Sequence, residues 1–584
     1  MTEPENKKIY TAITFSPVQG FIEKSRKLRD LYGSSFLLSY LSEAICKAAR
    51  RQLNPPEVDS PLNRDPVVSP ALINVTQGMP NQIIIEGYFP KQDAQEAFYK
   101  VWKDITKTCR QWIEKHIEYK FENSGENYIQ TNQRWQYCWS REWQLWATHA
   151  WEFFWATGKT INIARENLNE IKRSRNWVGI NWLGESSTLS GADAIAYPAM
   201  GLIQPKQWNY SQEKTIVEAF YKQLSWKVGE AYITTDEKRR LPSGQYLERC
   251  QELGAAIIDP NEELSIPELV KRLITLEEIA QEAGIPKKEL PKTFQKLNRF
   301  ESEHPTGWFM GDGDRAGDFL LRQGNSAAVL HNFSRKMREW GKQFKDFLPN
   351  DRVVYAGGDD FMGVFYSDSP DRPLAPQHCL NWFYSFPHIW QTHQQPITAS
   401  IGFVWAASGI PQRDVLQHCR QAEKSAKNSG RDRLCIRVLF NSGNSLEWTC
   451  PWWFLNILQN YRDREGGKNW GHLFEDIAIL ESRHALTSSS SVSTTQPWRA
   501  WIQQQCGVAL ALFAIYFGQE QRQALEEHLW DSCDCRSRTC ITGILGNSAV
   551  DWESVPEALN NWIINLAKVG YHLHRTPEPK YSTL

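Results

Sequence analysis

The sequence has no excess of charge of either sign, because 66 Lys and Arg residues stand against 67 Asp and Glu residues. A chain that binds nucleic acid through its overall electrostatic field usually carries a clear basic excess. We therefore expect that any contact with RNA is local or is made by partner proteins.

A long hydrophobic run is also missing, since no apolar stretch approaches the roughly 18 residues that a membrane span requires. The N-terminus is polar and acidic, unlike a signal peptide. We expect a cytoplasmic protein without a membrane partner. At 584 residues, the chain is long enough for three or four domains.

The cysteines are not arranged as a common structural metal site. The 12 cysteines are scattered, as is usual for reduced thiols. Cys533, Cys535 and Cys540 form a C-x-C-x4-C group near His528, but this spacing differs from common zinc sites. Ordinary thiols are the expected interpretation, and metal binding is the alternative.

The most informative feature that is present is the sequence Gly357-Gly358-Asp359-Asp360, flanked on both sides by apolar runs. This pattern predicts a β-hairpin with two carboxylates at its tip. The paired glycines should supply positive φ angles and let a ligand approach the backbone. Adjacent carboxylates that no core requires are typical of a Mg²⁺ site that also holds substrate phosphates. A solvated Gly-Asp turn is the alternative.

A second acidic cluster lies upstream and indicates a strand end, a glycine-rich loop and a helix start. We expect Asp312 to leave the strand beside the hairpin tip. Gly313 and Gly317 should let backbone N–H groups wrap a triphosphate at the helix N-terminus, with Asp314 in the same loop. The two clusters together predict a two-metal site for phosphoryl or nucleotidyl transfer. An acidic loop with a good helix cap is the alternative.

Further downstream, a strand at 397–404 precedes a helix from about Gln412 to Lys427. Lys427 is a candidate triphosphate ligand, although a basic last turn also suits the helix dipole. The order strand–helix–strand–strand–helix–strand, from about Trp308 to Leu439, matches a ferredoxin-like palm domain.

The N-terminal region repeats this form without its carboxylates. Residues 12–22 show the strand–turn–helix pattern of 308–320, and residues 82–87 indicate a strand without an acidic tip. We therefore expect one palm that binds metal and a degenerate palm that shapes a second nucleotide site. Ser34 and Ser35 are candidates to contact that nucleotide, while a simple helix N-cap is the alternative.

The expected fold class is α+β, with two ferredoxin-like palm domains and helical middle and C-terminal domains. The expected boundaries are 1–175 for the degenerate palm with a helical insertion, 176–300 for the mostly helical middle domain, 301–445 for the active palm and 446–584 for the helical C-terminal domain.

Residues 307–440 resemble the palm shared by GGDEF-type nucleotide cyclases and the large subunit of type III CRISPR–Cas effector complexes. The N-terminal motifs distinguish these two families. Residues 14–39 resemble the first palm of the Cmr-type (III-B) large subunit, residues 67–82 resemble its next segment, and residues 268–273 resemble its helical middle.

The resemblance implies an enzyme that converts ATP into cyclic oligoadenylate when target RNA is bound. It implies that Asp312, Asp359 and Asp360 ligate two Mg²⁺ or Mn²⁺ ions, and that Gly357, Gly358 and Lys427 lie near the nucleotide. The implied partners are the other effector subunits, the guide RNA and the target RNA.

The sequence departs from many large subunits of this family, which carry a nuclease domain with a His-Asp dyad. No His is followed by Asp anywhere in the chain, so we expect no DNase activity. One alternative is a stand-alone dinucleotide cyclase, whose usual Glu-Phe is replaced here by Asp360-Phe361. The other is an architectural subunit with an inactive palm. Three close carboxylates argue against it, because they would repel one another without metal.

Overall fold

The structure, a computed structural model, divides into two compact units. The first comprises residues 1–301, 320–342 and 354–358, and the second comprises residues 302–319, 343–353 and 359–584. The residues that the structure describes are 8–53, 65–117, 128–175, 184–201, 209–233, 235–287, 304–323, 326–348, 352–367, 372–486, 498–534, 539–546 and 554–574.

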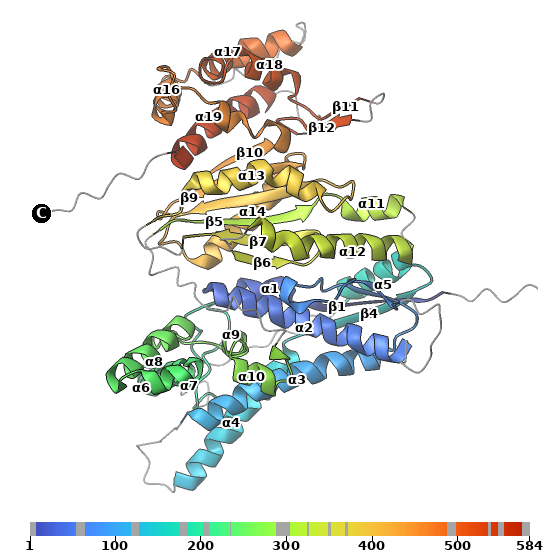
Figure 1. The fold of residues 1–584 in the computed structure, drawn as a ribbon, viewed down its shortest axis with the longest axis vertical. Coiled ribbons are helices and arrows are strands. Elements are labelled where there is room, and N and C mark those ends of the chain that lie inside the picture. Colours follow the sequence, from blue (N-terminus) through green and yellow to red (C-terminus); the bar gives the residue numbers. More distant parts are fainter. Residues whose placement is uncertain are drawn as a thin grey trace, which may run out of the picture. The chain divides into compact units, whose positions relative to one another are not determined.

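The first unit contains a four-stranded antiparallel sheet in the order β2-β3-β1-β4. Figure 1 labels two of its strands, β1 and β4. Two helices, α1 and α2, follow β1, and two, α3 and α4, follow β3, so the strands and helical connections alternate as predicted for a ferredoxin-like first palm. β1 is buried at nearly every position, as expected of a strand covered on both faces. The elements are β1 (Tyr10–Ser16), α1 (Val18–Glu23), α2 (Leu28–Leu53), β2 (Val67–Ser69), β3 (Ile83–Glu86), α3 (Lys91–His116), α4 (Tyr128–His149), β4 (Glu152–Gly158) and α5 (Ile161–Arg173).

The middle of the chain is helical, as predicted. Its two longest helices pack backbone against backbone: a side chain at Gly229 would clash with the Cys250 carbonyl, and one at Gly254 would clash with the Ser225 carbonyl. Glycine at both positions therefore allows the close approach. The helices are α6 (Tyr210–Tyr232), α7 (Thr235–Arg240), α8 (Ser243–Ile257), α9 (Ile266–Leu273) and α10 (Glu277–Glu282).

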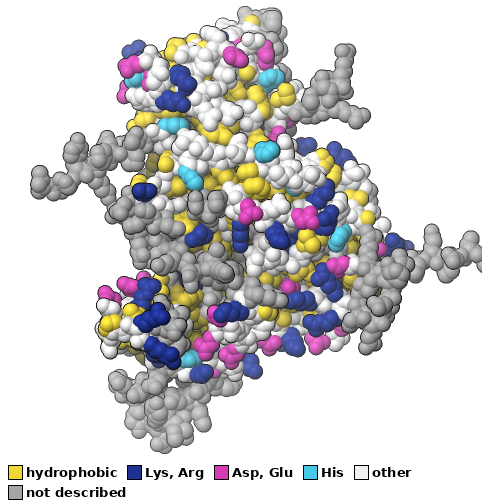
Figure 2. Space-filling view, in the orientation of Figure 1, with side chains coloured by type: hydrophobic (Ala, Val, Ile, Leu, Met, Phe, Trp, Pro, Cys, Tyr) yellow, Lys and Arg dark blue, Asp and Glu magenta, His cyan; other side chains and the backbone are white. Residues whose placement is uncertain are grey.

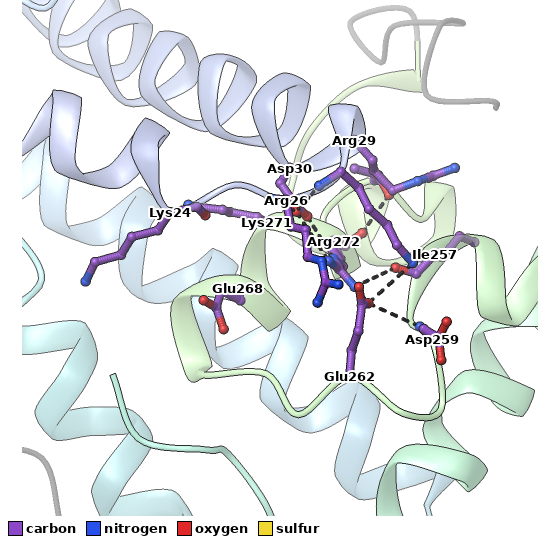
Figure 3. Close-up of polar contacts among 12 residues, drawn as sticks. Lys24, Arg26, Arg29, Asp30, Ile257, Asp259, Glu262, Glu268, Lys271 and Arg272 are labelled. Carbon is purple, nitrogen blue, oxygen red and sulfur yellow. Dashed lines mark hydrogen bonds and ion pairs between the residues drawn. The ribbon is translucent and has the colours of Figure 1, made fainter. Parts of the chain in front are cut away.

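A buried charge network joins the start of α2 to α9 (Figure 3). Asp30 accepts hydrogen bonds of 2.9 Å from the backbone N–H groups of Arg26 and Lys27, and one of 2.8 Å from Arg272 Nε. Arg272 also pairs with Glu262. The side chains of Asp30 and Arg272 are 0% exposed. Burial alone would raise the pKa of Asp30, but the Arg272 charge and these hydrogen bonds lower it below its ordinary value.

The second sheet has six strands in the order β10-β9-β8-β5-β7-β6. Its β5–β8 part has the ferredoxin-like order, and β9 and β10 extend the β8 edge. The pair β8–β9 is parallel and is joined by the crossover helix α14. The elements are β5 (Thr306–Gly313), α11 (Ala316–Arg322), α12 (Ala327–Gln343), β6 (Arg352–Ala356), β7 (Asp360–Phe365), α13 (Pro376–Gln391), β8 (Ala399–Ala406), α14 (Gln412–Asn428), β9 (Arg433–Leu439) and β10 (Ser445–Pro451).

One element of this palm was not predicted from the sequence. The helix between β7 and β8 is α13, so the ferredoxin-like unit closes with β8 at Ala406. The ferredoxin-like order is therefore complete before the predicted end at Leu439, and the predicted helix from Gln412 is confirmed as α14. That helix leads to β9, an additional strand that pairs with β8.

Aromatic rings fill the space between β5, β7 and α13. The ring centroids of Phe309 and Trp382 lie 4.8 Å apart, and those of Phe309 and Phe365 lie 5.0 Å apart. Gly311 and Gly363 make room for these rings, because a side chain at Gly311 would clash with Phe361 and one at Gly363 with Phe309. This packing holds the two strands that carry the acidic residues.

The C-terminal part is mostly helical, and Figure 1 shows its helices α16 to α19 in orange and red. They are accompanied by a two-stranded hairpin in which Cys533 pairs with Cys540. The side chains of Cys533, Cys535 and Cys540 lie outside the described residues. The elements are α15 (Ile457–Asn460), α16 (Trp470–Ser482), α17 (Trp498–Phe517), α18 (Gln519–Glu527), β11 (Ser532–Asp534), β12 (Thr539–Ile541) and α19 (Val555–His574).

Helix α17 corrects one expectation about hydrophobic length. Within the described residues, the window Ala500–Phe517 is 18 residues long with a mean hydropathy of 1.3, which is enough to cross a membrane by length and composition. Half of this window is buried in the structure. Core helices of other proteins pass the same test, so length and composition do not assign this helix to a membrane.

Candidate active site

The strand register brings Asp312 and Asp360 to the same edge of the sheet. β5 and β7 pair antiparallel, and Asp312 lies opposite Asp360. Asp359 immediately precedes β7, and its carbonyl accepts a 2.9 Å hydrogen bond from the Gly313 N–H. The two acidic clusters, which lie more than forty residues apart in sequence, therefore meet as predicted.

Burial and the nearby negative charges make ionisation less favourable in this cluster. The pKa of Asp359 is raised to about 7 by burial and then by the nearby charges of Asp312 and Asp360. Burial also raises the pKa of Asp312, and the opposing charge of Lys427 does not cancel this effect. The cluster therefore favours a cation or a proton beside it.

Lys427 reaches this cluster from the last turn of α14. Its Nζ contacts Asp312 Oδ2 and Glu423 Oε1. Burial lowers the pKa of Lys427, but the two carboxylates more than reverse this, and the net shift is upward. Lys427 thus lies beside the acidic cluster and neutralises part of its charge, while its contact with a triphosphate stays a prediction.

The side-chain atoms of Asp312, Asp359 and Asp360 decide whether the cluster suits a metal ion. In the described part of the chain, no three His, Cys, Asp or Glu side chains are already arranged to hold a metal ion. The donors nevertheless fit a hard divalent cation, because Asp312, Asp359 and Asp360 offer only oxygen, and burial together with the neighbouring charges raises the pKa of Asp359. Metal binding by these three residues stays a prediction.

Asp314 has a different surrounding from the one expected. Its carboxylate is buried and accepts hydrogen bonds from Thr398 Oγ1 at 2.9 Å, Ser400 Oγ at 2.7 Å and the Asp432 N–H at 3.0 Å. Both oxygens are engaged, so Asp314 ties β8 to the loop before β9. Its predicted nucleotide contact gains no support from this arrangement.

Two of the predicted glycines, Gly313 and Gly357, allow close packing. Neither Gly357 nor Gly358 has a φ angle in the left-handed region, so the prediction that they supply positive φ is wrong. A Cβ on Gly357 would lie 3.3 Å from the Gly78 carbonyl, and one on Gly313 would lie 2.9 Å from Asp359 Cβ. Gly317 is exposed, with open space where its side chain would be. Nucleotide contact at these glycines stays a prediction.

Ser34 and Ser35 lie inside α2, so the alternative that they cap this helix is wrong. Ser34 is fully buried and donates a 2.6 Å hydrogen bond to the Asp30 carbonyl. Ser35 is half-buried, and its hydroxyl oxygen lies 3.4 Å from the position of a Cβ on Gly78. Of the two, Ser35 is therefore the better candidate for a nucleotide contact.

No sequence pattern identified Arg338, Thr398 or Ser400, which support the acidic loops. Arg338 donates a 2.9 Å hydrogen bond to the Gly357 carbonyl. Arg338 is indistinguishable by sequence from the neighbouring basic residues of its helix, because its acceptor belongs to the backbone. A buried polar side chain on an otherwise apolar helix face is the one signal that could have pointed to it.

Comparisons with known proteins agree with the two-palm architecture. A family model for the N-terminal region of the CRISPR-associated protein Cmr2 matches residues 10–118. A model for the second palm domain of Cas10/Cmr2 matches residues 306–435. No curated protein is significantly similar in sequence to the chain.

Solved structures were also compared. The apo state of type III-B Cmr-beta is 10% identical, with coverage of 97% of this chain and 82% of that chain and a TM-score of 0.51. Csm1 of T. onnurineus is 14% identical, with 99% and 71% coverage and a TM-score of 0.42. A Csm1–Csm4 cassette in complex with cA4 is 14% identical, with 97% and 70% coverage and a TM-score of 0.39.

Only the first of these three TM-scores exceeds 0.5, and that likeness shows a shared fold. The two family models match regions of both palms, in the order in which the two sheets occur along the chain. In these two regions the chain is therefore similar to the Cas10/Cmr2 large subunits of type III CRISPR complexes.

Proposed function

We propose that this chain synthesises cyclic oligoadenylate from ATP as the large subunit of a type III CRISPR effector complex. The observation that carries the proposal is the meeting of Asp312, Asp359 and Asp360 at neighbouring ends of β5 and β7, where burial and then the charges of Asp312 and Asp360 raise the pKa of Asp359 to about 7. A structural role does not explain such a cluster, because close carboxylates destabilise a fold unless a cation binds them.

The chemistry would be nucleotidyl transfer. Two divalent ions held by these carboxylates would lower the pKa of the attacking 3′-hydroxyl and neutralise charge on the α-phosphate and the leaving pyrophosphate. Lys427 would steady the triphosphate, since its Nζ lies beside Asp312 and can turn from that carboxylate to a phosphate oxygen. Ser35 would contact the second nucleotide from the first palm.

The implied partners are other effector subunits, guide RNA and target RNA. Acidic and basic side chains are interspersed on the face shown in Figure 2, in keeping with nearly equal totals of 66 and 67. Such a surface gives little general attraction to RNA, so partner subunits would supply much of the RNA contact.

An architectural subunit with an inactive palm is the second candidate. It is favoured by one observation, namely that Lys427 already pairs with Asp312 while no group in the described residues is arranged to hold metal. The two candidates differ in a single property, which is synthesis from ATP.

The deciding experiment incubates the purified complex with labelled ATP, target RNA and Mg²⁺ or Mn²⁺. We expect cyclic oligoadenylate from the wild type and none from the Asp359→Ala/Asp360→Ala double variant, because both metals depend on these residues. Asp346→Ala, which removes an exposed carboxylate elsewhere in the same unit, is the control. Undiminished synthesis by the double variant would reject this active site, and no synthesis by the wild type would favour the architectural role.

A further inference from the structure

Arg338 on α12 is a buried cation whose hydrogen bonds go to backbone carbonyls of two separate segments. The residue is 1% exposed. Its Nη1 donates to the carbonyls of Gly78 and Gly357, the latter at 2.9 Å. Its Nη2 donates to the carbonyls of Leu72 at 3.3 Å and Asn74 at 3.0 Å. One guanidinium thus connects the turn at residues 357–360, here named the catalytic turn, to residues 72–78, here named the 72–78 segment.

The backbone of the 72–78 segment is bent so that its carbonyls can converge. Leu72 has a φ of 47° and Gly78 a φ of 81°, both in the left-handed region. Between them, the Asn74 side chain accepts a 3.0 Å hydrogen bond from the Thr76 N–H and starts a short 3-10 helix. A flexible loop would not hold these carbonyls together, so the local sequence builds the acceptor set.

Glycines bring the segment, the turn and α12 into direct backbone contact. A side chain at Gly341 of α12 would clash with the Ala356 carbonyl. A Cβ on Gly78 would lie 2.8 Å from Tyr355 Cβ, and one on Gly357 would lie 3.3 Å from the Gly78 carbonyl. A shift of the 72–78 segment therefore has little room to occur without moving the turn.

We infer that Arg338 is a positioning residue for the catalytic turn, which it fixes through the Gly357 carbonyl and couples to the 72–78 segment of the first palm. Fixing this carbonyl orients the peptide group that leads into Gly358 and Asp359. The guanidinium is suited to the role because it presents five donors in a rigid fork, whereas lysine presents a point charge on a flexible stem. The inference rests on the proposed function for its catalytic part, while the coupling itself is independent of activity.

Arg338→Lys tests the inference because it keeps the charge and removes the fork. We expect amide hydrogen exchange of residues 355–361 to accelerate roughly tenfold or more, since the Gly357 carbonyl loses its fixed partner. The turnover number should fall roughly tenfold to 100-fold with a smaller change in KM for ATP, because a slightly misplaced catalytic group costs this much.

Ser334→Ala is the matched control. Ser334 lies on the same helix and accepts a 2.9 Å hydrogen bond from the Ala71 N–H, so its loss weakens the tie between α12 and the chain just before the 72–78 segment without touching Gly357. Both variants should lower the melting temperature, but Ser334→Ala should leave the exchange of residues 355–361 and the turnover number near wild type.

Gly78→Ala provides a second test from the other side of the contact, and it decides the matter if Arg338→Lys does not fold. At a φ of 81°, alanine is strained. The strain should displace the Gly78 carbonyl, which accepts from the same Arg338 Nη1 as the Gly357 carbonyl. It should accelerate exchange at residues 355–361 as Arg338→Lys does. Wild-type exchange at the turn in the folded variants overturns the coupling, whereas faster exchange in a complex whose wild type makes no product rejects only the proposed function. Equal losses of turnover in Arg338→Lys and Ser334→Ala would show a merely structural role.

Discussion

Substitutions of the two partners of the Lys427–Asp312 ion pair should affect different ligands, metal for Asp312 and nucleotide for Lys427. Asp312→Asn should weaken Mn²⁺ binding roughly tenfold or more, because it deletes a ligand charge while keeping the shape. Lys427→Gln should leave Mn²⁺ affinity unchanged or higher, since it removes a cation that competes for Asp312. It should instead raise the KM for ATP. Mn²⁺ titration and ATP-dependent synthesis measure the two effects.

The exposed Lys424 on the same helix gives the control for this pair, because Lys424→Gln changes the charge of α14 without touching Asp312. If Lys427→Gln lost metal while Asp312→Asn retained it, the assignment of the two residues would be reversed.

Asp432 predicts a pH dependence of stability. Burial, and then the nearby Asp314, raise its pKa from 3.8 to about 6, so the folded state holds a proton that the unfolded state releases at lower pH. Its ionisation therefore costs stability progressively as the pH rises from about 4 to about 6. Asp432→Asn lacks this loss. Its melting temperature, relative to wild type, should increase across this range and stay constant above it; an unchanged difference would mean that Asp432 is ionised throughout.

At the scale of elements, the contact between α2 and α9 depends on the network around Asp30 and Arg272 (Figure 3). Arg272→Met should lower the free energy of unfolding by about 3–5 kcal/mol, because it leaves Asp30 charged and buried without its partner. The double variant Asp30→Leu/Arg272→Met should recover part of this loss. Denaturant unfolding of the four proteins measures it, and additive losses would show that the two side chains do not interact.

The palms were predictable because alternating apolar strands, glycine-rich loops and a basic helix end leave local patterns, and Asp312 could be paired with Asp359 and Asp360 from the element order alone. Helix α13 was missed although Asn381, Ser385 and His388 are exposed at helical spacing; Pro387 lies inside it, and proline usually ends or kinks a helix. The role of Ser34 was also hidden, because its partner is a carbonyl of its own helix.

At the scale of the whole molecule, acidic and basic residues balance, so local clusters such as Asp312, Asp359 and Asp360, and not the net charge, carry the candidate chemistry. The two compact units divide the signature sequence itself, with Gly357 and Gly358 in one and Asp359 and Asp360 in the other. A prediction made palm by palm therefore assigns the four residues to one domain, whereas the boundary between the compact units falls between Gly358 and Asp359.

The backbone carbonyls that accept hydrogen bonds from Arg338 have a consequence for the evolution of this contact. A carbonyl is the same in every amino acid, so position 72 can be replaced over time by any residue that keeps the backbone bend without altering what it offers to the guanidinium, whereas Asn74 also shapes the bend through its side chain. Covariation between position 72 and Arg338 is then expected to be weak, and an alanine scan of the segment would report little wherever the backbone bend survives. A contact of this kind is inherited as a backbone shape, and it is found by comparing structures.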